Sequence, residues 1–418
     1  MYTIAGKPVD ELVREYGTPL YVYDENAMRQ KLGDYRELFR DDELETEVVY
    51  ASKAFSCLAM VRLAAEYGLG LDVVSGGELY TAGKAGFDMS RVYFHGNNKT
   101  LAELQQAVKA RVGTIIVDNA MEAEVLAALM QDADYRVKTL LRINPGIEAH
   151  THHYIVTAHV DSKFGIAMTD EAEVVQTIRL LQACPNIEFA GLDAHIGSQI
   201  FDRNAFAELV RKLFAFAVRL QQEYGIRVHT LDLGGGFAAR YTEKDAPIPL
   251  PEVCRCILDT CREENRQAGG LIRKVIIEPG RSIVAEAGYM LYTVGFMKTT
   301  PNRHYIFVDG GMSDNIRPAL YQAEYDALIA GREEDTPAMT YTVAGKCCES
   351  GDVLIDAIKL PKTEPGDILV MKTTGAYGYA MASRYNKLPV PGVVFVRDGQ
   401  AREVIARETY EDLISHEK

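Results

Sequence analysis

The sequence lacks the long apolar run of a membrane-spanning helix. Such a helix needs about 20 consecutive apolar residues, and no segment of the 418-residue chain approaches that length. The opening residues, MYTIAGKPVDELVREYG, carry early acidic side chains and no basic cluster ahead of an apolar stretch, so they do not resemble a secretory signal. We therefore expect a cytoplasmic protein with no membrane partner.

Clusters of basic residues are also missing. The formal net charge of -14 repels the phosphates of nucleic acid, and no run of lysine and arginine or basic-aromatic stripe offsets this charge locally. Nucleic acid is therefore not an expected partner.

Cysteine and histidine form no evident metal-binding motif. The seven cysteines are odd in number, and Cys254, Cys256 and Cys261 lie in a helical pattern without zinc-finger spacing. The segment AHTHHY at 149–154 holds three histidines but no spaced carboxylate or cysteine partner. We expect reduced thiols and no bound metal.

Short β-branched runs alternate with amphipathic helical patterns along much of the chain. Eight such runs occur, at 47–51, 71–75, 92–95, 114–118, 139–144, 188–195, 230–234 and 275–278. Helix-start signals stand between them, including the S/T-x-x-E capping-box patterns that begin at Ser75 and Thr100. Eight βα units in about 250 residues predict an α/β fold with a (β/α)8 TIM-type barrel, whereas a doubly wound sheet would not need eight.

After residue 283 the pattern changes to short strand-like runs broken by glycine, proline and aspartate. These runs lie at 305–309, 340–343, 368–371 and 393–396. They predict a β-rich second domain, barrel-like or sandwich-like, and the strand-like residues 20–23 are expected to pair with it. The expected domains are the barrel over 30–285 and a discontinuous β-rich domain made of 1–29 with 286–418.

Polar residues follow the predicted barrel strands at their carboxyl ends, where barrels of this kind build active sites. They include Lys53, Asp72, His95, His195 and Glu278. The motif LGGG follows the seventh strand and EPGR follows the eighth, and barrels often bind a phosphate with these two loops. A tight βα turn explains the three glycines about equally well when the motif is taken alone.

A phosphate at that place points to a ligand that also carries a carbonyl and a ring. Lys53 could form an imine with an aldehyde, and Glu278 could pair with a ring nitrogen. Pyridoxal 5'-phosphate has all three features. Without the phosphate signal, Lys53 would be interpreted as a solvated lysine and His195 as a core histidine bonded to a backbone carbonyl.

A series of motifs in chain order resembles the diaminopimelate decarboxylases, pyridoxal-phosphate enzymes of the alanine-racemase-like fold (fold type III). The motifs are PLYVYD (19–24), YASKA (50–54), LDVVSGGEL (71–79), HGNNK (95–99), RINPG (142–146), SKFG (162–165), HIGSQI (195–200), LGGG (233–236), EPGR (278–281), RPALY (317–321), CESGD (348–352) and GAYG (375–378). The resemblance covers nearly the whole chain. One departure is Ser52, where the family often has a larger apolar residue, and it concerns the packing beside Lys53.

The resemblance implies a role for each matching residue of the cofactor site. It implies that Lys53 holds pyridoxal 5'-phosphate, that His195 stacks on the ring and that Glu278 binds the ring nitrogen. The other residues implied around the cofactor and its phosphate are Asp72, Ser198, Gly234, Gly235, Gly236, Gly280, Arg281 and Tyr377.

The resemblance also implies a substrate site and a partner subunit. The substrate residues would be Arg281, Arg317, Tyr321, Glu349 and Tyr377. Cys348 would be the acid that returns a proton to the α-carbon, and Cys348 and Glu349 would come from the partner, which implies a homodimer with shared active sites. Arginine suits the distal carboxylate of diaminopimelate, and Glu349 suits its distal ammonium. Taken alone, Arg317 would be interpreted as a surface salt bridge and Cys348 as a buried apolar thiol.

The expected activity is therefore decarboxylation of meso-diaminopimelate to L-lysine and CO2, the last step of lysine biosynthesis. One alternative is a decarboxylase of the same fold that acts on ornithine, lysine or arginine, which would have no use for an arginine at the distal end of the substrate. Another is a non-catalytic pyridoxal-phosphate-binding protein, in which CESGD would have no role.

Overall fold

The computed structural model describes residues 2–147 and 162–418. The chain divides into two compact units. The barrel unit contains residues 32–238 and 247–280, and the β-rich unit contains residues 1–31, 239–246 and 281–418. The short segment 239–246 therefore belongs with the β-rich unit, although it lies between two barrel strands in the sequence.

Eight parallel strands of the barrel unit close into a ring. Their order is β10-β11-β12-β4-β5-β6-β7-β8, and β8 pairs back to β10. The strands are β4 (Glu45–Ala51), β5 (Gly70–Val73), β6 (Val92–Phe94), β7 (Thr114–Val117), β8 (Val137–Asn144), β10 (Ile187–Asp193), β11 (Thr230–Asp232) and β12 (Lys274–Ile277). All eight predicted runs form barrel strands with small shifts at their ends, which confirms the predicted TIM-type barrel.

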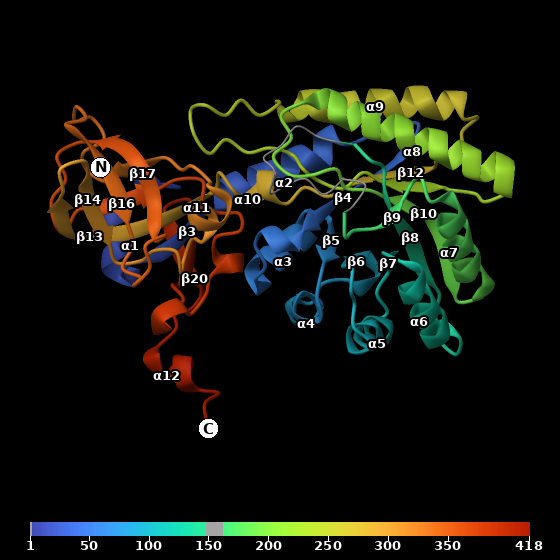
Figure 1. Cartoon of the computed structure of the whole chain (residues 1–418), viewed down its shortest axis with the longest axis horizontal. Helices are drawn as coiled ribbons and strands as arrows, with labels where there is room; N and C mark the ends of the chain where they lie inside the picture. The colour runs from blue at the N-terminus through green and yellow to red at the C-terminus, as the bar shows by residue number, and fades with distance from the viewer. Residues whose placement is uncertain (1, 148–161) are drawn as a thin grey trace. The chain divides into compact units, whose positions relative to one another are not determined.

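Helices connect these strands and flank the ring, and α8 and α9 run side by side (Figure 1). The helices are α2 (Glu25–Leu38), α3 (Leu58–Glu66), α4 (Gly76–Ala85), α5 (Leu101–Ala110), α6 (Ala120–Met130), α7 (Glu171–Ala183), α8 (Arg203–Tyr224) and α9 (Leu250–Gln267). A short strand, β9 (Ile166–Ala167), adds to the end of β8. Inside the ring, the strands contribute a buried apolar cluster of Val49, Tyr93, Ile116, Leu140, Ala190 and Ile276. This packed interior leaves the ends of the barrel for polar chemistry.

The two predicted capping boxes have different outcomes. At Thr100 the box is complete, because Thr100 accepts from the Glu103 backbone and Glu103 accepts from the Thr100 backbone. At Ser75 only the serine half forms, because the Glu78 carboxylate accepts from the backbone N–H of Val74 at 2.7 Å. The prediction of a full box at Ser75 was therefore wrong.

The β-rich unit is built on one sheet with the path β17-β16-β14-β13-β3-β19-β20. Its strands are β1 (Thr3–Ile4), β2 (Lys7–Pro8), β3 (Leu20–Asp24), β13 (Gly288–Thr299), β14 (His304–Val308), β15 (Ala327–Ile329), β16 (Met339–Ala344), β17 (Val353–Leu360), β18 (Ile368–Met371), β19 (Val393–Arg397) and β20 (Gln400–Ile405). Its helices are α1 (Val9–Tyr16), α10 (Arg281–Val284), α11 (Arg317–Tyr321) and α12 (Tyr410–Ile414). Strand β3 pairs with β13 and β19, so the first residues of the chain complete a sheet that is otherwise formed by its last third.

Two further findings concern the described residues. No helix within 2–147 and 162–418 combines the length and the apolar character needed to cross a membrane. All seven cysteines lie in these ranges, and none of them forms a disulfide there.

Candidate active site

Lys53 lies just beyond the carboxyl end of β4, in a single 3-10 turn over Ser52–Ala54. The hydroxyl of Ser52 donates to the carboxylate of Glu78 at 2.9 Å. The serine that departs from the family pattern is therefore anchored by a hydrogen bond rather than by apolar packing, and this bond uses the carboxylate that the capping box at Ser75 lacks. The anchor fixes the turn that carries the lysine.

The amine of Lys53 points to the end of the next strand. Its Nζ lies 3.5 Å from Oδ2 of Asp72, and Asp72 is fully buried at the end of β5. Parallel pairing places Ala51, the last residue of β4, beside Asp72. Lys53 follows two residues after Ala51, so the strand register brings it close to Asp72. The predicted lysine and the predicted aspartate are therefore neighbours.

Glu278 follows β12 and forms an ion pair with His95, which follows β6. The distance between His95 Nε2 and Glu278 Oε1 is 2.7 Å, and the same nitrogen lies 3.9 Å from Oδ1 of Asp72. Burial alone would raise the pKa of Glu278, but the charge of His95, with a smaller contribution from Lys53, outweighs it and lowers the pKa to about 2. The series Lys53, Asp72, His95 and Glu278 thus links the predicted lysine and the predicted carboxylate at one end of the barrel.

Two further buried carboxylates, Asp193 at the end of β10 and Asp232 at the end of β11, lie beside this series. One ligand atom from each of His95, Asp193, Asp232 and Glu278 falls within 4.8 Å of the others. Burial raises the pKa of Asp193 to about 6, although His95 and Arg142 oppose the shift. Burial and the neighbouring carboxylates raise the pKa of Asp232 well above its usual value. We expected no metal from the sequence, and the tight His95–Glu278 ion pair is consistent with that prediction, which stays untested.

His195 lies after β10 against the glycine turn. Its Nδ1 accepts a hydrogen bond from the backbone N–H of Gly235 at 3.1 Å. Burial, followed by the charges of Lys53 and Arg142, lowers the pKa of His195 to about 3, so the ring is neutral at physiological pH. A neutral, anchored imidazole is suited to lie against a flat ring.

The glycine turn after β11 requires glycine for steric reasons. A Cβ added at Gly235 would lie 2.4 Å from the backbone oxygen of Glu278, and one added at Gly236 would lie 2.6 Å from that of Gly197. Gly236 also has a φ of +95°, a region that favours glycine. The turn is therefore packed closely against the loops that carry His195 and Glu278.

The β-rich unit holds a second group of predicted residues. Arg281 donates to the hydroxyl of Tyr241 at 2.6 Å and lies 4.8 Å from the ring centre of Tyr377. Arg317 is buried, donates to the hydroxyl of Tyr325 and lies 4.7 Å from the ring centre of Tyr241. The structure thus brings both predicted arginines into one aromatic cluster.

Sequence reasoning missed Tyr241 and Tyr325. Their rings meet edge to face with centroids 5.4 Å apart. The only signal in the sequence was a tyrosine soon after each of two motifs, Tyr241 after LGGG and Tyr325 after RPALY. Neither position has a spacing that indicates a contact with an arginine.

The remaining predicted residues lie at several places in the described chain. Cys348 and Glu349 are exposed, and the Cys348 backbone N–H donates to Asn386 at 2.8 Å. Tyr321 is half-buried at the end of α11, and Ser198 is half-buried in the loop after β10. The histidines of AHTHHY at 149–154 lie outside the described residues.

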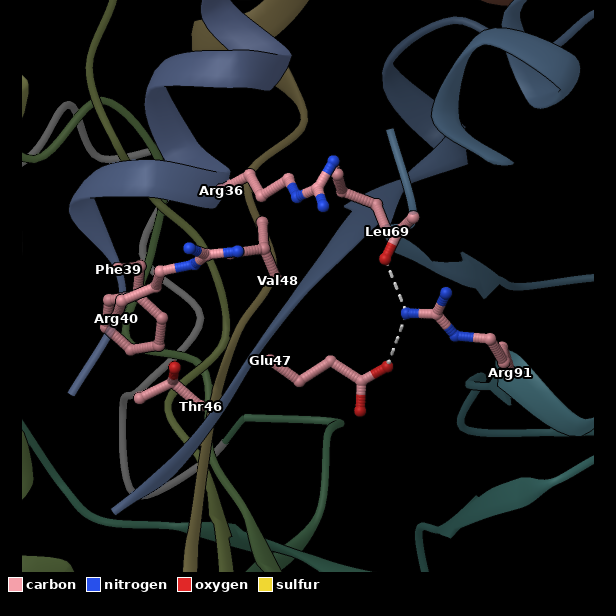
Figure 2. Close-up of a pocket in the computed structure, with 9 residues that line it drawn as sticks. Arg36, Phe39, Arg40, Thr46, Glu47, Val48, Leu69 and Arg91 are labelled. Atoms are coloured by element: carbon pink, nitrogen blue, oxygen red, sulfur yellow. Dashed lines mark hydrogen bonds and ion pairs between the residues drawn. The ribbon is translucent and has the colours of Figure 1, made fainter. Parts of the chain in front are cut away.

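A surface hollow of about 230 Å³ lies at the opposite, amino end of the barrel (Figure 2). Arg36 and Arg40 of α2 line it together with Glu47 at the start of β4. Arg91 donates to the backbone oxygen of Gly68 at 2.6 Å and reaches Glu47 at 3.4 Å (Figure 2). Because barrels of this type carry their chemistry at the carboxyl ends, we assign no catalytic role to this hollow.

A comparison with models of known protein families assigns the chain to a class of pyridoxal-dependent enzymes. Residues 25–285 match the family described as "Pyridoxal-dependent decarboxylase, pyridoxal binding domain". The matched range contains Lys53, His95, His195, the glycine turn and Glu278.

The more similar relatives narrow the class. A diaminopimelate decarboxylase from Halalkalibacterium halodurans is 48% identical over 98% of this chain and 94% of that protein. The crystal structure of diaminopimelate decarboxylase from M. jannaschi has a TM-score of 0.91 at 33% identity and covers 98% of this chain and 94% of that one. The enzyme from Helicobacter pylori, solved in complex with L-lysine, has a TM-score of 0.87 at 33% identity and covers 97% and 98%. The chain therefore belongs to the diaminopimelate decarboxylase family of pyridoxal-dependent decarboxylases.

Proposed function

We propose that this protein uses pyridoxal 5'-phosphate to decarboxylate meso-diaminopimelate, releasing CO2 and L-lysine. The observation that carries the proposal is the linked arrangement of Lys53, Asp72, His95 and Glu278 at the carboxyl end of the barrel. The family membership supports the reaction class. L-lysine, the product of this reaction, is the ligand that is bound in the H. pylori relative.

The residues present fit the proposed cofactor. Asp72 and Asp193 each have two buried oxygens without a hydrogen-bond partner in the described chain, as expected where a bound group with donors completes the site. In the glycine turn, the N–H of Gly234 donates to Asp232 and that of Gly235 to His195, so we propose that Gly236 binds the phosphate, with Ser198, Gly280, Arg281 and Tyr377 at the same end. When bound, pyridoxal phosphate supplies a ring that accepts the electron pair left by the departing CO2.

The protein's own groups hold and orient the reacting parts. We propose that Lys53 holds the cofactor through its amine and that Glu278, ionised because of His95, accepts a hydrogen bond from the ring nitrogen. His195 is fixed by the Gly235 N–H and would contact the ring as a neutral imidazole. These contacts would hold the ring in one orientation, so that the bond to the departing carboxylate could align with the electron-accepting π system.

Recognition of the far end of the substrate requires both charges to be matched. Arg317 and Arg281 offer guanidinium groups for a carboxylate, with Tyr321 and Tyr377 beside them, and Glu349 offers a carboxylate for the distal ammonium. Cys348 is the proposed proton donor to the α-carbon. Both Cys348 and Glu349 are exposed in the single chain, which suits residues that serve the site of a partner subunit. We therefore propose a homodimer with shared sites, and the cytoplasmic location stays a prediction.

Product analysis tests this proposal. Purified protein loaded with pyridoxal phosphate should release CO2 and L-lysine in equal amounts from meso-diaminopimelate. L-ornithine, L-lysine and L-arginine, which lack the distal carboxylate, should react far more slowly at equal concentration. No CO2 from diaminopimelate, or faster release from any of the other three, would overturn the assignment.

A further inference from the structure

His95 stands at the centre of a set of carboxylates that the strand ends bring together. Its imidazole follows β6 and is buried, with only 4% of the residue exposed. Nε2 lies 2.7 Å from Glu278 and 3.9 Å from Asp72, and one ring nitrogen lies within 4.8 Å of oxygens from Asp193 and Asp232. Four different strands therefore point an acid at one histidine.

The groups that face His95 carry opposite charges in unequal number. The carboxyl groups are those of Asp72, Asp193, Asp232 and Glu278. The cations in the same network are Lys53 and Arg142, whereas His195 is neutral. Burial lowers the pKa of His95, but Glu278 and Asp72 outweigh it, so the pKa lies above its usual value. The surrounding carboxylates therefore favour the protonated imidazole, and Glu278 is the carboxylate that it touches.

Lys99, another buried basic residue, shows how His95 differs from a residue with a purely structural role. Lys99, also buried, donates to the backbone oxygens of Gly96 and Ile116 and to the carboxylate of Glu122, so its bonds are complete. Around His95, by contrast, the oxygens of Asp72 and Asp193 lack hydrogen-bond partners in the described chain. Burying charges without full pairing costs stability, so a role in folding does not account for this network.

We propose that His95 is a positioning residue that fixes one oxygen of Glu278 and keeps the carboxylate ionised, leaving its second oxygen to accept from the ring nitrogen of the cofactor. This inference rests on the proposed function and deepens it. The ring nitrogen would then be bound by a carboxylate whose charge is set by a histidine three strands away in the ring, rather than by solvent. The histidine of HGNNK thereby gains a role in tuning the cofactor.

The test compares His95→Asn and His95→Gln with a matched control, His229→Asn. His229 belongs to the same barrel but lies just before β11, at the amino end, with Nδ1 3.4 Å from the backbone oxygen of Leu271. The readouts are the dissociation constant of pyridoxal phosphate from the apoprotein, the pH titration of the visible absorbance of the bound cofactor without substrate, and kcat and KM.

Both His95 variants should bind the cofactor about 10- to 100-fold more weakly, because Glu278 loses the charged partner that holds its carboxylate in place. The acid limb of the absorbance titration and of kcat should move to higher pH, because Glu278 loses the cation that depresses its pKa. KM for diaminopimelate should change little, since His95 does not contact the distal end of the substrate. His229→Asn should match wild type in all of these measurements.

Imidazole rescue provides an independent readout. In His95→Gly, added imidazole should restore cofactor affinity in proportion to its protonated fraction, whereas sodium chloride at equal ionic strength should not. In the wild-type apoprotein, labelled with 15N-histidine, His95 should give the signals of an imidazolium at neutral pH. A neutral imidazole there, or His95→Asn and His95→Gln behaving as His229→Asn does, would overturn the inference about His95 alone. A wild-type protein that neither binds the cofactor nor releases CO2 would instead overturn the proposed function.

Discussion

The two ends of the barrel hold charged residues in opposite ways. At the amino end, Glu47 accepts a hydrogen bond from Tyr93 at 2.7 Å and pairs with Lys274 and Arg91, so its carboxylate is fully engaged. At the carboxyl end, Asp72 and Asp193 keep oxygens without hydrogen-bond partners in the described chain. Both sets lie on strands of the same barrel, and both include carboxylates.

This difference shows which end is organised for stability and which for chemistry. Paired charges at the amino end satisfy one another within the fold, and nothing further is needed to complete them. Incompletely paired carboxylates at the carboxyl end cost free energy, and proteins retain such groups where a ligand or a reaction uses them. The same comparison predicts that substitutions at the two ends have effects of different kind and sign.

The largest effect should come from Lys53. Lys53→Ala removes the amine that holds the cofactor, so turnover should fall by about a thousandfold or more. Lys84→Ala, at an exposed lysine near the end of α4 that lies over the ring of Tyr80, is the matched control and should keep full activity. Steady-state CO2 release measures both variants, and a Lys53→Ala protein with normal turnover would remove the carboxyl end as the site of chemistry.

The next largest effect is on the stability of the fold at acidic pH, and it comes from His195. Its folded-state pKa of about 3 lies below the unfolded value of about 6.5, so between these values the unfolded chain binds the extra proton and stability falls as pH falls. His195→Asn should therefore flatten the pH dependence of the unfolding free energy by about 1.4 kcal/mol per pH unit in this window. Urea unfolding at several pH values measures the slope. An unchanged slope would show that His195 is protonated normally in the fold.

At the amino end, Glu47→Gln should lower stability without touching catalysis. Burial opposes ionisation, but Lys274, Tyr93 and Arg91 together lower the pKa of Glu47. A carboxylate with a lowered pKa stabilises the fold above its unfolded pKa, so the full loss of about 1–3 kcal/mol should be present at neutral pH. The cofactor absorbance and kcat should stay at wild-type values. A loss of activity at unchanged stability would contradict the division between the two ends.

The smallest effect has the opposite sign. Asp193 has its pKa raised to about 6, so at neutral pH the fold carries a buried charge that it does not fully compensate. Asp193→Asn should raise the unfolding free energy by about 1 kcal/mol at neutral pH, with the gain vanishing as the pH falls from 6 toward the unfolded pKa. Parallel measurement of kcat should show a loss. Lower stability together with unchanged kcat would show that Asp193, like Glu47, serves the stability of the fold rather than catalysis.

The barrel was predictable because its strands leave a local signal. Short β-branched runs separated by helical patterns identify each strand, and the carboxyl-end rule then selects Lys53, Asp72, His195 and Glu278 without knowledge of their contacts. The β-rich unit was predicted less completely. Strand β13 is interrupted by Gly295 and has an exposed end, and β20 is mostly polar, so neither gives the apolar alternation of a half-buried strand.

The contacts within the site could not be predicted in the same way. The ion pair of His95 with Glu278 depends on how the barrel closes and on how far each strand extends along the barrel axis. No local sequence pattern specifies that extent. The hydrogen bonds of Tyr241 and Tyr325 to the two arginines likewise join segments whose approach is set by tertiary packing. Local sequence thus identifies the chemical groups, and the closed fold determines which of them act on one another.

The most direct test of the account is the position of the covalent label after borohydride reduction. Protein loaded with pyridoxal phosphate is reduced and digested, and mass spectrometry locates the peptide that carries the pyridoxyl group. The account predicts the label on Lys53, in the segment that follows β4. A label on another lysine, or no label on a protein that still releases CO2 from diaminopimelate, would contradict it.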